Sequence, residues 1–213
     1  MSGAQEGMGT GVLGFIILFP LFMAAVVIHE VSHGWVAHFF GDPTASLAGR
    51  LSLNPLKHMD PVGTFLLPLM LVLVRAPFVF GWAKPVPINP LYLRHPKRDM
   101  LWVGAAGPAA NFLIAAAGSL LIKTGLGFFP TTLIAFLRTF VLINLVLGTF
   151  NLIPIPPLDG SRVLVGLLPR TLARSILALE RWGIVLVMLL LALGFFDRFL
   201  WRTVGFLGNL LGL

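Results

Sequence analysis

Residues 11–40 read GVLGFIILFPLFMAAVVIHEVSHGWVAHFF, and this stretch indicates the environment in which the chain folds. Every residue up to Ile28 is apolar, glycine or proline. A helix that crosses the hydrocarbon core of a membrane needs about 20 such residues. His29, Glu30 and His33 continue the run as a helix. The stretch therefore predicts a membrane helix that carries ionisable residues at one end.

The composition of the whole chain agrees with this prediction. Of its 213 residues, 57% are hydrophobic and 11% are charged, and the mean hydropathy is +0.94. Soluble domains average about 25% charged residues. We therefore expect an all-α polytopic membrane protein with about five or six transmembrane helices, in which residues 1–213 form a single membrane-embedded domain.

Charge and cysteine content exclude several classes of function. The 15 Lys and Arg residues give a net charge of +7, but they lie mostly between apolar runs. No basic patch alternates with stacking aromatic residues, so a nucleic-acid partner is not expected. The chain has no cysteine, which excludes a disulfide framework, a thiolate zinc site and a cysteine nucleophile. The lipid bilayer is the partner that the composition predicts.

The apolar segments differ in length. The stretch over about residues 62–74 reaches only about 22 Å as a helix, which is less than the hydrocarbon thickness of about 30 Å. Three prolines and a glycine then exclude a helix over 78–90. We expect a re-entrant, partly extended loop around residues 61–93 and leave open whether 61–75 fully span. Other apolar segments cover about 99–122, 131–150 and 178–196, with a last short one over 199–213.

The motif His29-Glu30-Val-Ser-His33 predicts a metal site. Histidines four positions apart lie on one face of a helix, so both imidazoles can bind a single Zn²⁺ ion. Glu30 lies beside them and is the candidate general base, which takes a proton from water and returns it to the leaving amine. A chance helical pair is the alternative, but unliganded polar residues are costly at membrane depth.

Catalytic zinc sites typically use three protein ligands, so a third ligand must come from elsewhere. One known arrangement has Gly and His shortly after the motif, where this chain has Val36 and Phe39. Another uses a distant Glu, but Glu6 and Glu180 stand in no recognisable ligand motif. A glutamate or a third histidine is therefore a poor candidate for the third zinc ligand.

Asp159 is the better candidate for the third ligand. It follows the proline-rich stretch NLIPIPPLDG, residues 151–160. Non-helical backbone at membrane depth is tolerated only where it is buried in protein or lines a cavity. The alternative is that Asp159 caps the helix that begins near Ser161. The residues alone do not decide between these two interpretations.

The two motifs together resemble those of the site-2 proteases, which are intramembrane metalloproteases, and the chain looks like their short bacterial and archaeal branch. The resemblance implies zinc ligands at His29, His33 and Asp159, with Glu30 as catalytic base. It implies that Asn151 assists substrate or oxyanion binding, and the alternative is an Asn that satisfies loop carbonyls. Further stretches that carry the resemblance are Gly41–Thr44, Gly49–Pro55, Gly81–Pro87 and Gly107–Asn111.

The distribution of basic residues predicts a topology. If the metal site faces the cytoplasm, Arg50, Lys57 and Arg162 lie inside, as the positive-inside tendency prefers. Residues 61–93 must then enter and return on the same side. The resemblance suggests that this segment presents a backbone edge to an unwound substrate, and the alternative is a plain connecting loop. We expect a multi-pass protein of a prokaryotic inner or plasma membrane.

Water must reach a zinc ion at membrane depth, so the site needs a polar cavity. Arg50, Lys84 and Arg162 are candidates for lining it. Snorkelling of these long side chains to the membrane surface accounts for them equally well.

The function predicted is hydrolysis of peptide bonds in or next to transmembrane segments of membrane proteins, with one Zn²⁺ per chain as cofactor. The expected partners are transmembrane protein substrates and the bilayer. The alternatives are a membrane zinc-binding protein or transporter without proteolytic activity, and an inactive relative. The sequence does not reveal the substrate, the cleavage position, the regulator or the oligomeric state.

Overall fold

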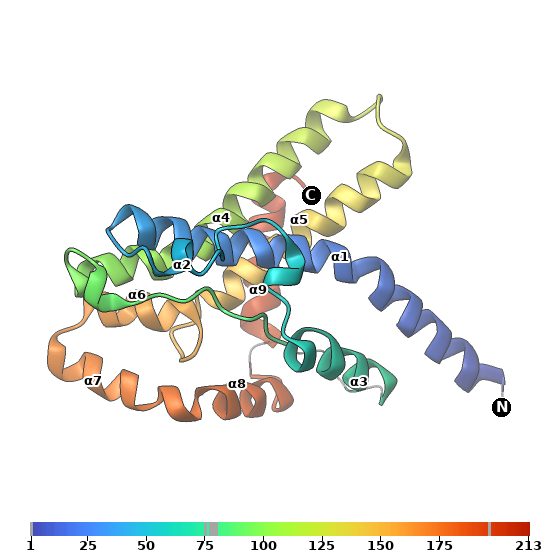
Figure 1. The fold of residues 1–213 in the computed structure, drawn as a ribbon. Coiled ribbons are helices and arrows are strands. Elements are labelled where there is room, and N and C mark those ends of the chain that lie inside the picture. The colour runs from blue at the N-terminus through green and yellow to red at the C-terminus, as the bar shows by residue number, and fades with distance from the viewer. Residues whose placement is uncertain (1, 75, 77–80, 196) are drawn as a thin grey trace.

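The computed structural model describes residues 2–74, 76, 81–195 and 197–213 (Figure 1). These residues form helices and loops and contain no strand, which confirms the predicted all-α fold class. Short 3-10 turns lie at Pro55–Lys57, Pro90–Tyr92 and Glu180–Trp182, and a π-helical turn at Pro61–Leu66. The α-helices are α1 (Ser2–Phe39), α2 (Thr44–Leu47), α3 (Leu67–Leu73), α4 (Pro96–Gly125), α5 (Thr131–Asn151), α6 (Asp159–Leu167), α7 (Arg170–Ala178), α8 (Gly183–Ala192) and α9 (Asp197–Leu211).

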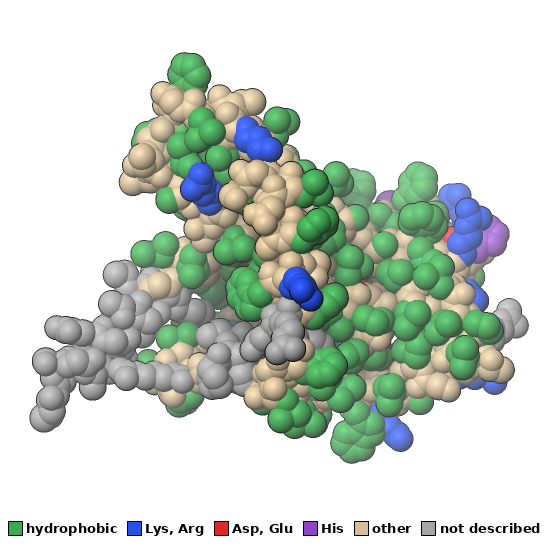
Figure 2. All heavy atoms as spheres, turned by 180° about the vertical axis from the view of Figure 1, so that it is seen from behind, with side chains coloured by type: hydrophobic (Ala, Val, Ile, Leu, Met, Phe, Trp, Pro, Cys, Tyr) green, Lys and Arg blue, Asp and Glu red, His purple; other side chains and the backbone are tan. Residues whose placement is uncertain are grey.

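The described residues contain four helical stretches that are long and apolar enough to cross a membrane, whereas the sequence predicted about five or six. The other two segments form shorter helices, at Pro61–Leu73 and in α9. A helix of 15 residues such as α9 reaches about 22 Å, less than the hydrocarbon thickness. Hydrophobic side chains cover much of the surface, as lipid exposure requires (Figure 2). The four candidate spans are Ile17–Phe39, Pro96–Gly125, Thr131–Asn151 and Thr171–Ala192.

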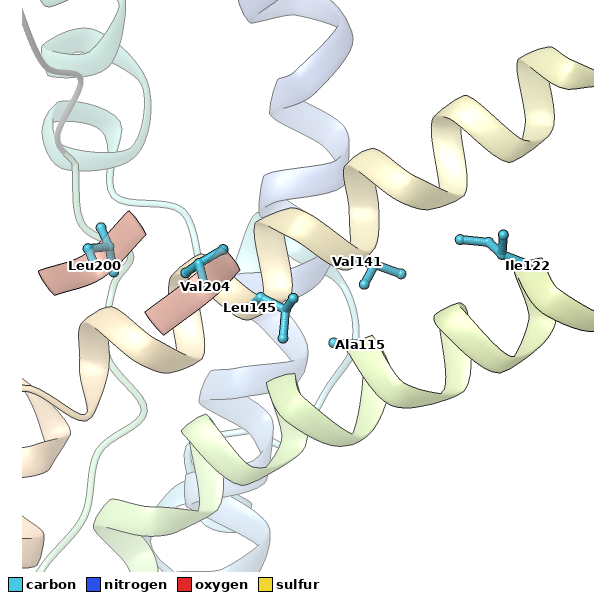
Figure 3. Packing of buried hydrophobic residues seen from close by; sticks show 6 residues of the cluster. All are labelled: Ala115, Ile122, Val141, Leu145, Leu200 and Val204. Atoms are coloured by element: carbon cyan, nitrogen blue, oxygen red, sulfur yellow. The ribbon is translucent and has the colours of Figure 1, made fainter. Parts of the chain in front are cut away.

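Helices α4 and α5 form a hairpin that packs against α1 and α9 (Figure 1). A Cβ atom at Gly118 of α4 would lie 2.7 Å from Cγ2 of Val141 on α5, so glycine lets the two helices approach closely. Small residues serve this purpose in membrane helices, where packing rather than the hydrophobic effect drives association. The apolar cluster between the helices consists of Ala115, Ile122, Val141, Leu145, Leu200 and Val204 (Figure 3).

Residues 61–93 leave the body of the molecule and return to it, as expected for a re-entrant element. The Trp82 amide donates to the Gly63 carbonyl at 3.0 Å, and the Lys84 amide donates to the His58 carbonyl at 2.9 Å. The Thr64 hydroxyl donates to the Trp82 carbonyl at 2.7 Å. The outgoing and returning chains therefore lie side by side, with α3 between them in the sequence. Residues 75 and 77–80 lie outside the described residues.

Residues 81–89, the extended segment, have no regular secondary structure. It connects the excursion to the start of α4 and runs across the molecule in Figure 1. Its carbonyl and amide groups are therefore not used up in a helix, and they reach the residues at the end of α1.

Candidate metal centre

His29 and His33 lie one turn apart in the second half of the α1 candidate span, Ile17–Phe39. Their Nε2 atoms are 3.1 Å apart, and their ring centroids are 4.7 Å apart. Both side chains are buried, with 4% and 3% of their surface exposed. The α-helical spacing thus places two imidazoles on one face, as the sequence predicted.

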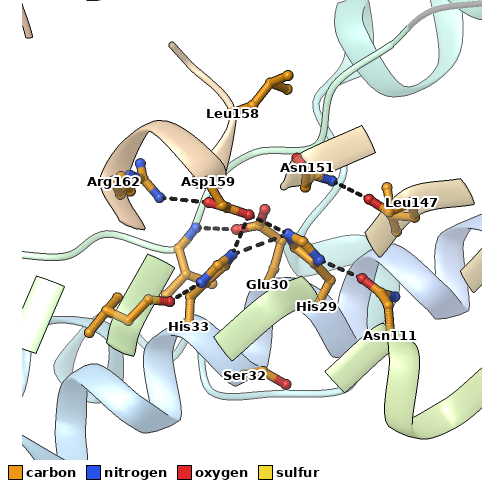
Figure 4. Close-up of polar contacts among 12 residues, drawn as sticks. His29, Glu30, Ser32, His33, Asn111, Leu147, Asn151, Leu158, Asp159 and Arg162 are labelled. Carbon is orange, nitrogen blue, oxygen red and sulfur yellow. Dashed lines mark hydrogen bonds and ion pairs between the residues drawn. The ribbon is translucent and has the colours of Figure 1, made fainter. Parts of the chain in front are cut away.

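Asp159 approaches the two histidines from the opposite side. Its Oδ2 atom lies 2.9 Å from His29 Nε2 and 3.1 Å from His33 Nε2. Figure 4 shows the carboxylate pointing at both rings. Among the described residues, these three form the group of His, Cys, Asp and Glu that could hold a metal ion. Asp159 is the first residue of α6 and makes no capping hydrogen bond; Leu158 occupies the N-cap position. The structure thus disfavours the capping interpretation.

The other ring nitrogen of each histidine is held by an acceptor. His29 Nδ1 lies 2.6 Å from Asn111 Oδ1, and His33 Nδ1 lies 2.6 Å from the Val103 carbonyl. The Asn111 amide is oriented by its own donation to Asn144 Oδ1 at 2.9 Å. Because carbonyl oxygens only accept hydrogen bonds, both Nδ1 atoms carry the proton. Each Nε2 therefore directs a lone pair toward the other and toward Asp159.

This arrangement fits zinc. Three acceptor atoms within 3.1 Å of one another repel unless a cation lies among them. Two imidazoles and a carboxylate are a donor set that zinc prefers, and bonds of about 2.0–2.1 Å in tetrahedral geometry place ligand atoms about 3.3 Å apart. The observed separations of 2.9–3.1 Å are close to that value. Three ligands also leave the fourth position open, as catalytic zinc sites do.

Burial alone raises the pKa of Asp159, but when His33 and His29 carry a proton on Nε2 as well, their charge and their hydrogen bonds more than offset the burial, so this pKa lies well below its usual range. Arg162 Nη1 lies 3.2 Å from the second oxygen, Oδ1. Asp159 lies outside the four candidate spans. The carboxylate is therefore ionised, as a metal ligand must be.

Two glycines of α4 allow the site to assemble. A Cβ atom at Gly107 would lie 2.5 Å from His33 Nε2 and 2.6 Å from His29 Nε2. A Cβ atom at Gly104 would lie 3.2 Å from the Asp159 carbonyl. Helix α4 thus passes directly against both imidazoles and the start of α6, which only glycine permits. The stretch Gly107–Asn111 carries part of the family resemblance, and the sequence alone assigns it no role.

Glu30 lies beside the three residues and points toward them (Figure 4). Its Oε2 atom accepts a hydrogen bond of 2.9 Å from the Val86 amide of the extended segment. Oε1 has no hydrogen-bond partner in the part of the chain that the structure describes. One carboxylate oxygen is thus oriented by backbone, and the other remains available.

Comparison with known proteins places these contacts in a family. The sequence model of Peptidase family M50 matches residues 120–194, which include Asp159. The Bacillus subtilis protein named "Putative zinc metalloprotease YwhC" is 35% identical over 195 residues, which cover 86% of this chain and 85% of that protein. This chain belongs to peptidase family M50, the site-2 proteases.

Two further relatives extend the comparison for this M50 protein. Rip2 from Mycolicibacterium smegmatis, which carries the same description, is 30% identical over 199 residues, or 89% of this chain and 72% of that protein. "Zinc metalloprotease MJ0392" from Methanocaldococcus jannaschii is 30% identical over 156 residues, or 72% of this chain and 35% of that protein. No solved structure matches significantly. The family and the apolar helices make this chain a membrane zinc metalloprotease.

Two buried side chains hold the extended segment of the M50 protein against the metal centre. Arg50 Nη2 donates to the Lys84 carbonyl at 2.6 Å and to the Pro85 carbonyl at 3.3 Å. Asp42 Oδ2 accepts from the Asn89 amide at 2.7 Å. Arg50 was a candidate for lining a water cavity, but only 8% of its surface is exposed. A buried guanidinium needs acceptors, and the carbonyls of the extended segment supply them for Nη2, whereas Nε has no partner among the described residues.

Asn151 lies at the edge of the cluster in Figure 4. Its Nδ2 atom donates to the Leu147 carbonyl, one turn earlier in α5, at 3.0 Å. An amide nitrogen carries two hydrogens, so one remains for another acceptor. The alternative prediction was an Asn that satisfies loop carbonyls. Asn151 does bond to a backbone carbonyl, but that of Leu147 belongs to helix α5 and not to a loop. A role in substrate binding stays a prediction.

Proposed function

We propose that this protein is an endopeptidase that hydrolyses peptide bonds in or next to transmembrane segments of other membrane proteins, as in regulated intramembrane proteolysis. The observation that carries this proposal is the convergence of His29, His33 and Asp159 beside Glu30, with both histidines inside a candidate membrane span. These three residues hold one Zn²⁺ per chain.

Zinc, when bound, supplies a Lewis acid for the scissile carbonyl and lowers the pKa of water. Glu30 acts as the general base: it takes a proton from the attacking water and gives it to the leaving amine. The Val86 amide holds Oε2, so the carboxylate keeps one orientation and Oε1 is left to take the proton. Asn111 and the Val103 carbonyl fix the histidine tautomer that leaves both Nε2 atoms free for the metal.

Asn151 binds the substrate carbonyl or its oxyanion in this proposal. The support is its free amide hydrogen and its place at the edge of the cluster. One preorganised donor of this kind is worth about a hundredfold to a thousandfold in kcat.

The substrates are transmembrane proteins, and the metal centre faces the cytoplasmic side of a prokaryotic inner or plasma membrane. Basic residues on the loops around the centre, such as Arg50 and Lys57, support this orientation. A substrate helix must unwind before cleavage because its backbone is hydrogen-bonded internally. The extended segment next to Glu30 supports binding of such an unwound chain.

The test compares the parent protein with Glu30→Gln in liposomes. Zinc content and cleavage of several membrane-spanning test substrates are measured for both. We expect about one zinc in each and cleavage only by the parent. Ser32→Ala is the matched control, because its hydroxyl bonds to the Ile28 carbonyl away from the metal centre, and it should cleave like the parent.

The alternative of a zinc transporter makes a different prediction for the same liposomes. Zinc would cross the membrane equally well with the parent and with Glu30→Gln, and neither would cleave any substrate. That result would overturn the protease proposal.

A further inference from the structure

A cavity of about 610 Å³ adjoins the metal centre. It lies between the extended segment, the start of α4, α6 and α7. Two of its lining residues also contact the centre: Val86 donates to Glu30, and Arg162 pairs with Asp159. Pockets that bind small ligands or side chains measure about 300–1,000 Å³. The cavity is therefore large enough for part of a substrate, and it is bordered by two residues that contact the reacting groups.

The cavity combines apolar walls with positive charge. Lys97, Arg162 and Arg174 line it, and Glu180 is the acidic residue among the described lining residues. Lys97 and Arg174 form no ion pair with any described residue, whereas Arg162 pairs with Asp159. Two cations thus face the cavity without a partner. The apolar wall consists of Val86, Ile88, Met100, Val165, Ile176 and Leu177.

The positions of Lys97 and Arg174 in the candidate spans indicate where the cavity lies relative to the membrane surface. Lys97 is the second residue of the candidate span Pro96–Gly125, and Arg174 lies in the first turn of the candidate span Thr171–Ala192. Both side chains are exposed. The starts of membrane spans lie at the water interface, where Lys and Arg side chains settle. The two cations of the cavity therefore lie where a substrate would pass from lipid to water.

We infer that this cavity is a substrate subsite for apolar residues next to the scissile bond, followed on the aqueous side by an acidic residue. The inference rests on the proposed protease function. The apolar walls take the end of the substrate's membrane segment, and Lys97 and Arg174 pair with the carboxylate. A substrate with Asp or Glu at this juncture is cleaved in preference to one with Lys.

The test uses membrane-spanning substrates that differ at one residue only. Asp, Asn or Lys is placed in turn at each of the first few positions on the aqueous side of the scissile bond, and kcat/KM is measured in neutral detergent. We expect Asp over Lys by about twofold to fivefold at one or two adjacent positions, since solvent-exposed ion pairs are of that strength. Added salt should reduce the preference.

Charge reversal makes the test specific. Lys97→Glu and Arg174→Glu should each remove or invert the preference for Asp. Arg98→Glu is the matched control: Arg98 is exposed and adjacent to Lys97, but it does not line the cavity. The inference is overturned if the preference survives both reversals, or if Arg98→Glu removes it equally.

A lipid headgroup is the competing occupant and is tested in vesicles with and without phosphatidylglycerol. If Lys97→Glu and Arg174→Glu change only the response to this lipid and not the substrate preference, the subsite inference fails. Binding of fluorescent Asp and Lys peptides to Glu30→Gln separates the two proposals. Absence of cleavage by the parent overturns the function, whereas equal binding of both peptides overturns the subsite.

Discussion

The metal centre and the extended segment lie side by side but are held in place by different means. His29, His33 and Asp159 stand on helices α1 and α6, and each histidine has a second partner on α4. The extended segment has no regular secondary structure, and single side chains hold its backbone at intervals. The comparison indicates that the chemistry is built on rigid helices, while the neighbouring surface depends on a few contacts that can be removed one at a time.

Loss of a ligand is the change with the largest expected effect. His33→Ala and Asp159→Ala each remove one of the three donor atoms. We expect zinc content to fall to about one tenth of the parent or less, because two ligands hold zinc weakly, and cleavage to be lost. Metal analysis of the purified protein measures this directly. Full zinc content in both variants would show that the metal lies elsewhere.

Gly107→Ala tests whether α4 must touch the imidazoles. The new Cβ would lie 2.5 Å from His33 Nε2, so the ring must shift. A shift of about 1 Å in a reacting group costs about a hundredfold in rate, and zinc affinity should fall as well. Gly205→Ala is the control because a Cβ there meets nothing within 4 Å. Parent-like activity in Gly107→Ala would contradict the close approach of α4.

Much of this centre was predictable from the sequence because helical spacing and a short motif determine it locally. His29, Glu30 and His33 required only the periodicity of a helix. Asp159 was one of two open interpretations, since its approach to α1 depends on tertiary packing across the chain. The partners of the histidines were not predicted: an Asn and a carbonyl within an apolar helix give no local signal. Residues 107–111 are part of the resemblance to the site-2 proteases, but the resemblance does not say that Gly107 and Asn111 contact the histidines.

The fold was predicted in class but not in detail. Composition and run length identified an all-α membrane protein, and proline content identified the extended segment. About five or six spans were predicted, and four helices of the described residues are long and apolar enough to cross a membrane; apolar composition alone does not distinguish a short helix from a crossing one. Arg50 was assigned to a cavity or to the membrane surface, yet it is buried. Its partners are backbone carbonyls, and no side-chain pattern reveals those.

Asn111→Leu should weaken the centre without destroying it. The substitution removes the acceptor that holds the proton on His29 Nδ1. Loss of such an outer partner typically costs about tenfold to a hundredfold in metal affinity. Competition with a zinc chelator measures the affinity, and cleavage should recover when zinc is added in excess. Asn144→Leu should have a smaller effect in the same direction, since Asn144 acts only through the Asn111 amide. Equal affinities in all three proteins would show that His29 needs no support.

Arg50→Lys tests the extended segment rather than the metal centre, and it should have the smallest effect. Arg50 donates to both carbonyls from one nitrogen, Nη2, and the lysine ammonium stands one bond closer to the backbone, so it does not reach the same place between them. We expect the extended segment to loosen, KM to rise by about threefold to tenfold, and zinc content to stay at the parent's level. Lys57→Met is the control, because its ammonium bonds to the Gly49 carbonyl in the same loop and not to the extended segment. If Arg50→Lys lost zinc in proportion to activity, the segment and the metal centre would be one cooperative unit, and the distinction between rigid chemistry and a separately held surface would fail.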